Sequence, residues 1–443
     1  MSPLAQAGGL SLHGIGGAKD LPISPELAIA GAVAALTVSF TVLALAWRKP
    51  RYDEVERGRL TGIRAPLEVP AVVAVLRVFG VVVFLYAAVA GVLGKDLLTN
   101  PIFGMFYVWW WVGLPLLSVL LGPVWRAISP ARTINLVFAK VSGGDQDRGL
   151  FDYPARLGYW PAALGLFAFV WMELVYPYST ELGSVRLWCS VYVALMLIGG
   201  ALFGSSFYER GDPFEVYSTL AGKLSIWGSR DGQVVVRSPL AGLATVEAAP
   251  GLIGVVAVLF GSTAFDSFRD SIRWVSFVQG TDRSPYLMNN LGLLGFCLGV
   301  GVIFAIGTMA SGVEPGFRRT TLPNLFAHSV VPIVIGYIVA HYLTFWFETG
   351  QQTLIQASDP LSDGSNYLGT GNWSVNYWLS LHPTLLADLK VVSVVTGHVL
   401  GVISAHDRAV KLLPKRHQLT GQLPLLFAMV AFTVGGLYLL FAA

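Results

Sequence analysis

Several histidines and aspartates of this chain lie inside long apolar stretches, where ionisable groups are costly and usually functional. His341 lies in an apolar stretch over residues 322–347, Asp388 in one over 385–405, and Asp266 in the last turn of one over 250–268. If each stretch is a helix that crosses a membrane, a rise of about 1.5 Å per residue places the three side chains at similar depths. The sequence therefore predicts one shared polar site.

The chemistry of these three groups is that of a metal site or a general base. One imidazole and two carboxylates suit zinc and similar divalent ions, with a position left open for water. A bound metal would lower the pKa of that water and generate a nucleophile near neutral pH. His341, Asp266 and Asp388 are thus the candidate catalytic and metal-binding residues. No HxH or HExxH spacing is present, and interhelical hydrogen bonding is the alternative for each residue.

A second pair of histidines matches in depth nearer the opposite face. His328 begins the stretch that contains His341, and His398 lies in the stretch that contains Asp388. Two histidines on neighbouring helices can ligate a haem, so His328 and His398 are candidate haem ligands. Hydrogen bonds across a helix interface are again the simpler interpretation.

The composition identifies the elements that must position these groups. The chain is 54% hydrophobic and 12% charged, with a mean hydropathy of +0.63, whereas soluble domains are about 25% charged. A membrane core about 30 Å thick needs roughly 20 helical residues, and unpaired backbone groups exclude other structures from lipid. We therefore expect an all-α bundle of about ten transmembrane helices, near residues 27–47, 71–93, 102–122, 161–179, 184–207, 250–268, 287–310, 322–347, 385–405 and 421–442.

The distribution of lysine and arginine predicts the orientation. Alternate loops hold 21 of these residues and the other loops hold six, with Arg77 and Lys390 inside spans. The positive-inside rule then places both termini outside the cytoplasmic membrane. Residues 1–26 form an extracytoplasmic segment and residues 27–443 a single polytopic domain. A net charge of +3 gives no reason to expect a nucleic-acid partner.

Three shorter stretches in the basic loops carry further expectations. Trp125–Lys140 and Phe214–Trp227 are amphipathic and are expected to lie along the inner headgroup surface. Gln233–Val236 has strand propensity but is long enough only for one arm of a hairpin.

Four stretches resemble a known family of polytopic actinobacterial membrane proteins, the fenitrothion hydrolase-like proteins. The resemblance covers almost the whole chain, and the stretches are His13-Gly14-Ile15-Gly16-Gly17 with Asp20-Leu21-Pro22, Leu121–Arg126, Gly261–Asp266, and Gly397-His398 through Ala405–Arg408. It implies hydrolysis of an organophosphate ester and identifies no catalytic residue.

Three functions remain open from the sequence. The first is a membrane-embedded hydrolase of small lipophilic phosphoesters that enter from the lipid, using the His341, Asp266 and Asp388 group. The second is a transporter or permease in which Glu173, Arg77, Asp388 and His398 handle protons or substrate. The third is a haem-bearing redox protein.

Overall fold

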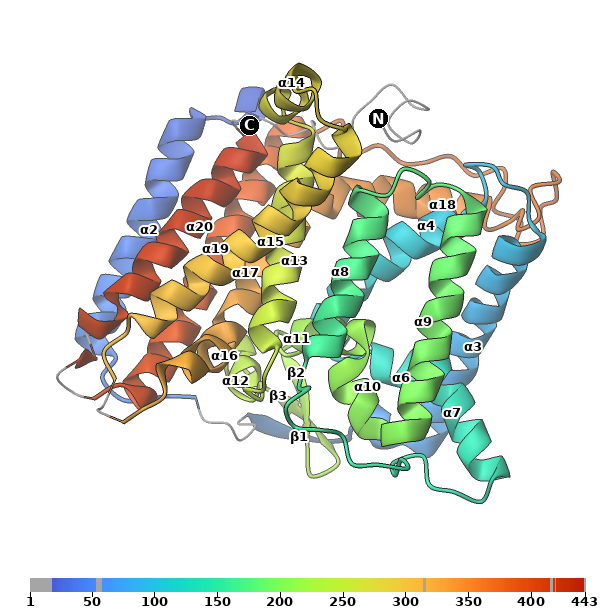
Figure 1. Cartoon of the computed structure of the whole chain (residues 1–443), viewed down its shortest axis with the longest axis horizontal. Coiled ribbons are helices and arrows are strands. Elements are labelled where there is room, and N and C mark those ends of the chain that lie inside the picture. Colours follow the sequence, from blue (N-terminus) through green and yellow to red (C-terminus); the bar gives the residue numbers. More distant parts are fainter. Residues whose placement is uncertain (1–17, 53–57, 314–315, 415–416, 419, 442–443) are drawn as a thin grey trace.

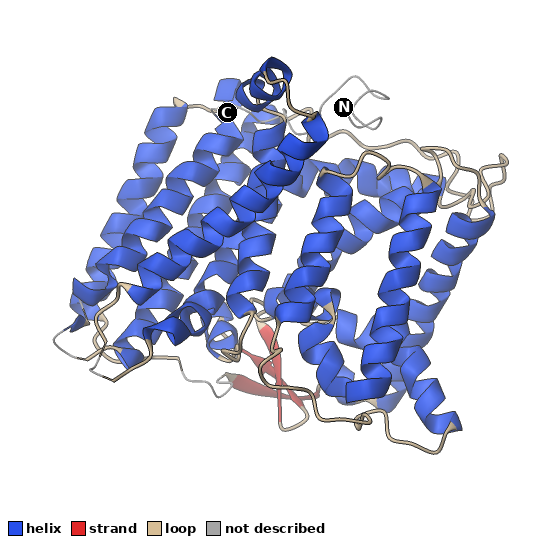
Figure 2. Ribbon diagram, in the orientation of Figure 1, coloured by secondary structure: helices blue, strands red, loops and turns tan. Residues whose placement is uncertain are grey.

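The computed structural model describes residues 18–52, 58–313, 316–414, 417–418 and 420–441. His13 and its glycine-rich neighbours lie outside the described residues. The described chain is a helical bundle with one small sheet (Figure 2), which confirms the predicted all-α class. The protein is an integral membrane protein with many spans.

Each of the ten predicted apolar segments corresponds to a helix or a run of joined helices. Among the described residues, nine are long and apolar enough to cross a membrane. The tenth, α8, has 15 residues and a length of about 22 Å. The ten are α2 (Pro25–Ala46), α3 (Pro70–Leu93), α4–η4–α5 (Pro101–Leu121), α8 (Trp160–Leu174), α9 (Leu182–Phe203), α13 (Leu252–Arg269), α15 (Pro285–Met309), η5 to α18 (Arg319–Gln356), α19 (Pro383–Leu412) and η9–α20 (Thr420–Phe441).

These helices form two neighbouring groups (Figure 1). Helices α2, α13, α15, α17, α19 and α20 pack together in one group, and α3, α4, α5, α8 and α9 belong to the other. Helix α8 packs against α13 and so joins the two groups. A site built from α8, α13 and α17 therefore lies where the groups meet.

The long segment that holds both His328 and His341 is not one continuous α-helix. It runs through η5 (Arg319–Thr321), α16 (Leu322–Phe326), the 3-10 turn η6 (Ala327–Val330), α17 (Val331–Thr344), the π-helical turn η7 (Phe345–Thr349) and α18 (Gly350–Gln356). A second π-helical stretch, η4 (Met105–Gly113), packs against η7. Isolated π-helical turns occur often at functional sites, and His341 lies one turn before η7.

Glycines allow α17 and α19 to touch through their backbones. A Cβ atom added to Gly336 would lie 2.4 Å from the Ser393 carbonyl oxygen, and one added to Gly397 would lie 2.4 Å from that of Pro332. Only residues without a side chain fit so close an approach. The two helices are thereby fixed along the stretch that separates His328 from His341.

The basic loops fold into short helices at one end of the bundle. They are α6 (Trp125–Ile128), α7 (Pro130–Val141), α10 (Ser205–Gly211), α11 (Pro213–Gly222) and α12 (Pro239–Ala244). Two 3-10 turns, η2 (Ala18–Asp20) and η3 (Pro66–Glu68), and the helix α14 (Ile272–Gly280) complete the helical elements described.

The expectation that Phe214–Trp227 lies on the membrane surface is wrong. Helix α11 is buried against α5 and α8, and the Phe214 ring stacks on Trp110 with centroids 4.1 Å apart. Aromatic burial of this kind outweighs the amphipathic surface position. Helix α7 does expose apolar side chains, namely Val137, Phe138 and Val141.

Gln233–Val236 forms more than one arm of a hairpin. It is strand β3, which pairs antiparallel with β2 (Trp227–Arg230) and also with β1 (Arg59–Arg64) from the loop after α2. The order is β1-β3-β2. Sequence reasoning missed β1 because its partner strand lies about 170 residues away in the chain.

Candidate functional site

His341 and Asp266 form a direct pair inside the bundle. Nε2 of His341 on α17 lies 3.0 Å from Oδ2 of Asp266 on α13. Both residues are 6% exposed, so water does not compete for the contact. The structure therefore brings together two of the three residues predicted to share the site.

The other ring nitrogen of His341 contacts a serine that the sequence analysis did not select. Nδ1 lies 3.1 Å from Oγ of Ser267, which is half-buried on α13. Neighbouring helical residues point about 100° apart, so Asp266 and Ser267 can face opposite edges of one imidazole. The result is a hydrogen-bonded chain Ser267–His341–Asp266.

The contacts of the Asp266 carboxylate determine which ring nitrogen of His341 carries the hydrogen. Oδ2 also accepts a hydrogen bond of 2.7 Å from the Tyr342 hydroxyl, and Nε of Arg269 lies 3.1 Å from Oδ1 in an ion pair. A carboxylate with a cationic neighbour accepts rather than donates, so Nε2 of His341 carries the hydrogen. Nδ1 is then the acceptor that faces Ser267.

Two other groups hold Ser267. The Tyr337 hydroxyl donates to its Oγ over 3.0 Å, and Oγ is 3.2 Å from the Thr263 carbonyl oxygen of the same helix. Ser267 has one hydroxyl hydrogen, which it can direct either to Thr263 or to His341. A serine bonded only to its own helix is the purely structural alternative.

Glu173 lies beside this cluster on α8. Its carboxylate interacts electrostatically with Asp266 and Arg269, and Arg269 donates a 2.6 Å hydrogen bond to the Leu174 carbonyl oxygen. Oε2 of Glu173 is shielded from solvent and has no hydrogen-bond partner within the described part of the chain. An unpartnered buried carboxyl oxygen is expensive, so Glu173 is a second candidate functional group.

Asp388 does not join the pair. Its side chain is exposed on α19 and makes none of the hydrogen bonds or ion pairs given above for His341 and Asp266. Across the described residues, no three histidine, cysteine, aspartate or glutamate side chains converge in an arrangement that could hold a metal ion. The predicted three-ligand metal site therefore does not fit these residues, and no step is derived through a metal.

The two candidate haem ligands each bond to their own helix. Nδ1 of His328 lies 3.1 Å from the Leu325 carbonyl oxygen, and Nδ1 of His398 lies 2.8 Å from that of Val394. Between them the backbones touch, since a Cβ on Gly401 would lie 2.7 Å from the Ser329 carbonyl oxygen. This packing leaves no space for a porphyrin ring between His328 and His398.

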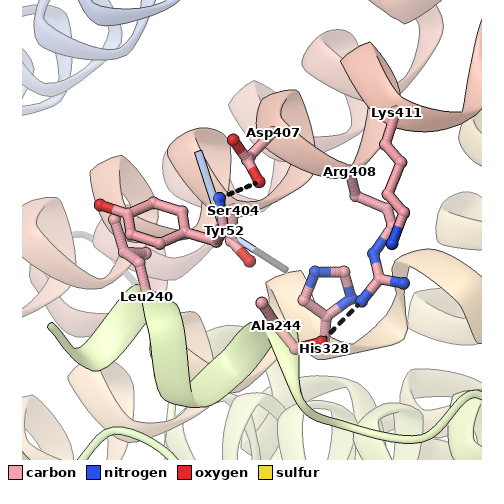
Figure 3. A pocket seen from close by; sticks show the side chains of 8 residues that line it. All are labelled: Tyr52, Leu240, Ala244, His328, Ser404, Asp407, Arg408 and Lys411. Carbon is pink, nitrogen blue, oxygen red and sulfur yellow. Dashed lines mark hydrogen bonds between the residues drawn. The ribbon is translucent and has the colours of Figure 1, made fainter. Parts of the chain in front are cut away.

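A small cavity beside His328 is lined by charged groups of α19 (Figure 3). Its volume of about 10 Å³ holds roughly one water molecule. Asp407 accepts from the Tyr52 backbone over 3.2 Å, and Arg408 donates to the Ala244 carbonyl oxygen over 3.1 Å. These residues connect α19 to two basic loops, which is a structural role.

The sequence offered one signal for Ser267 that depth arguments alone did not use. The polar residues Ser262, Thr263, Asp266 and Ser267 interrupt the otherwise apolar α13 within six positions. The Ser267 hydroxyl, next to Asp266 in the chain and at the depth predicted for His341, could therefore have been considered as a nucleophile beside a base. Tyr342 and Arg269 required the structure.

Comparison of the chain with protein-family models, with curated proteins and with solved structures finds no match.

Proposed function

We propose that this chain is an integral membrane hydrolase of small lipophilic esters, with organophosphate triesters as the first class to test. The observation that carries the proposal is the Ser267–His341–Asp266 chain, with contacts of 3.1 and 3.0 Å. A nucleophile, a base and a carboxylate that orients the base are the three parts of a nucleophilic hydrolase. In serine proteases Nε2 faces the serine and Nδ1 faces the aspartate, whereas here Nδ1 faces Ser267 and Nε2 faces Asp266. In both arrangements the serine proton moves to the ring nitrogen that faces the serine.

The reaction follows from the tautomer. Oγ of Ser267 attacks the phosphorus or carbonyl carbon, and its proton moves to Nδ1 of His341. The bond to the leaving alkoxide or aryloxide breaks, and that group takes the proton from Nδ1. Water then attacks the Ser267 ester, gives a proton to Nδ1, and the proton returns to Oγ as the bond to Ser267 breaks.

The remaining groups support this path electrostatically. Asp266, held by Arg269 and Tyr342, keeps Nε2 protonated and stabilises the imidazolium that forms. The Tyr337 hydroxyl donates to Oγ over 3.0 Å and so holds the Ser267 hydroxyl beside Nδ1. Ser267 is more exposed than His341 or Asp266, as a nucleophile that meets substrate must be.

The location of the site suits an apolar substrate. Asp266 and His341 lie inside helices that qualify as membrane spans. An ester dissolved in the bilayer therefore has a shorter route to the Ser267–His341–Asp266 site than one dissolved in water. The resemblance to fenitrothion hydrolase-like proteins agrees with this substrate class.

The test is turnover of a chromogenic nitrophenyl phosphotriester and a nitrophenyl carboxyl ester by purified full-length protein. Ser267→Ala should lower kcat/KM by about 10³-fold or more, since removal of a nucleophile has effects of that size. Ser262→Ala is the matched control, because its hydroxyl lies on the same helix and contacts only the Leu259 carbonyl oxygen in the described structure. Equal turnover by both variants would contradict the proposal.

Proton-coupled transport is the second candidate, and Glu173 favours it. A buried carboxyl with one unpartnered oxygen beside Arg269 and Asp266 is the kind of group that carries protons in transporters. Proteoliposomes with a pH-sensitive dye inside would show proton flux that Glu173→Gln abolishes and Ser267→Ala leaves intact. A hydrolase without transport shows the opposite pattern, with turnover that depends on Ser267.

A further inference from the structure

A second polar cavity, separate from the His341 site, lies among the basic loops. Its volume is about 150 Å³, enough for several water molecules, and three arginines line it: Arg77, Arg126 and Arg132. They come from α3, α6 and α7. Three cations that share one cavity repel each other unless nearby anions offset their charges.

Arg77 is the distinctive member. It is half-buried in the first half of α3, and no hydrogen bond or ion pair joins it to any residue that the structure describes. Glu173, a carboxyl group on α8, interacts with Asp266 and Arg269 rather than with Arg77. A guanidinium with five donors on a membrane helix requires an acceptor.

The other two arginines are held in place by carboxylates outside the cavity lining. Arg132 donates to Oε1 of Glu215 over 2.6 Å through Nη2 and to Oγ of Ser205 over 3.2 Å through Nη1. Arg126 lies 3.2 Å from Glu209. Arg132 is thus rigidly positioned, while Arg77 supplies the free donors.

Two neutral groups and one carboxylate complete the relevant lining. Asn135 lines the cavity and is 8% exposed. Its amide makes no hydrogen bond to a described residue. Gln146 belongs to the same lining. Asp147 also faces the cavity and accepts a hydrogen bond from Ser205. Glu209 and Glu215 offset the charges of Arg126 and Arg132, and Asp147 interacts electrostatically with Arg77. The cavity therefore offers an anion N–H donors rather than a large net positive charge.

The surroundings connect this cavity to the lipid. Helix α3 has 24 residues, about 36 Å at the usual rise, which exceeds a core about 30 Å thick by only about 6 Å. The backbone of Arg77, about 10 Å from the start of the helix, therefore lies inside the core, and its long side chain reaches the loop residues that line the cavity. Helix α7, which supplies Arg132 and Asn135, exposes Val137, Phe138 and Val141, side chains suited to acyl chains.

We propose that this cavity binds a phosphate-bearing anion, either the headgroup of an anionic phospholipid or a free phosphate. Arg77 and Asn135 donate to the phosphate oxygens, and Arg132 supplies fixed positive charge. Guanidinium groups bind phosphate strongly through paired hydrogen bonds, and basic pockets between membrane helices bind anionic headgroups. The Asp147 carboxylate repels the phosphate and lowers the affinity of the cavity for it.

The experiment uses delipidated full-length protein in detergent. The thermal unfolding midpoint is measured by tryptophan fluorescence against added phosphatidylglycerol, phosphatidylcholine or inorganic phosphate. Wild type should be stabilised by phosphatidylglycerol more than by phosphatidylcholine, and Arg77→Gln should weaken the apparent affinity about tenfold. Arg148→Gln is the matched control, because Arg148 is exposed in the same basic region and does not line the cavity.

Two further variants keep the proposal testable if Arg77→Gln does not fold. Asn135→Ala should also weaken binding, and Asp147→Asn should strengthen it by removing a like charge. Stabilisation by inorganic phosphate with the same dependence on Arg77 would support the site and identify free phosphate as the ligand. Equal responses of Arg77→Gln and Arg148→Gln to every additive, or weaker binding in Asp147→Asn, would overturn the proposal.

Discussion

Ser267 and His341, 74 positions apart in the chain, meet with Oγ and Nδ1 separated by 3.1 Å. Because the opposite ring nitrogen faces Asp266, the imidazole is held between a hydroxyl and a carboxylate. The arrangement of both partners on one helix is the basis of the proposed hydrolase.

Replacement of His341 should separate catalysis from stability. His341→Gln removes the base and should lower kcat/KM by about 10³-fold or more, while the loss of stability stays near 0.6–2 kcal/mol. Tyr342→Phe removes another donor to the same Oδ2 of Asp266 and serves as the control. Its stability should fall by a similar amount with turnover within about tenfold of wild type. Similar turnover in the two variants would show that His341 is structural.

The sequence sufficed for the ten helical segments because long apolar runs have few alternatives in a membrane. It also paired His341 with Asp266 from depth alone. Depth does not give the direction in which a side chain points around its helix, and for that reason Asp388, at a matching depth, was expected in a cluster that it does not join. Ser267 was missed for the same reason.

The basic loops were harder to predict than the spans. Helix α11 has a pattern typical of a surface helix, yet Phe214 is fully buried against Trp110. Its position depends on tertiary packing that no local pattern encodes. Strand β1 likewise depends on β3, which lies far along the chain.

The contact between α17 and α19 should be intolerant of any side chain at Gly397. Gly397→Ala would place Cβ 2.4 Å from the Pro332 carbonyl oxygen and should destabilise the protein by about 1–3 kcal/mol. Gly435→Ala on α20 is the control, since nothing lies within 4 Å of its added Cβ. Thermal unfolding of both variants checks this, and equal midpoints would contradict the close backbone approach.

The charge bias gives a defined orientation to test. Reporter fusions after Arg64, Ala155 and Arg416 should report the cytoplasm, and one at Gly364 should report the outside, because lysine and arginine concentrate on the cytoplasmic side. A cytoplasmic signal at Gly364 would reverse the proposed orientation and place the His341 site toward the inner leaflet.

Covalent capture of the nucleophile tests the central claim most directly. A fluorophosphonate forms a stable phosphonyl ester with a serine that a neighbouring base activates. After treatment of the full-length protein, peptide mass spectrometry should find the adduct on Ser267 in wild type and in Ser262→Ala, and none in His341→Gln. Wild-type protein with no adduct on Ser267, or with an adduct there that persists in His341→Gln, would contradict the Ser267–His341–Asp266 hydrolase.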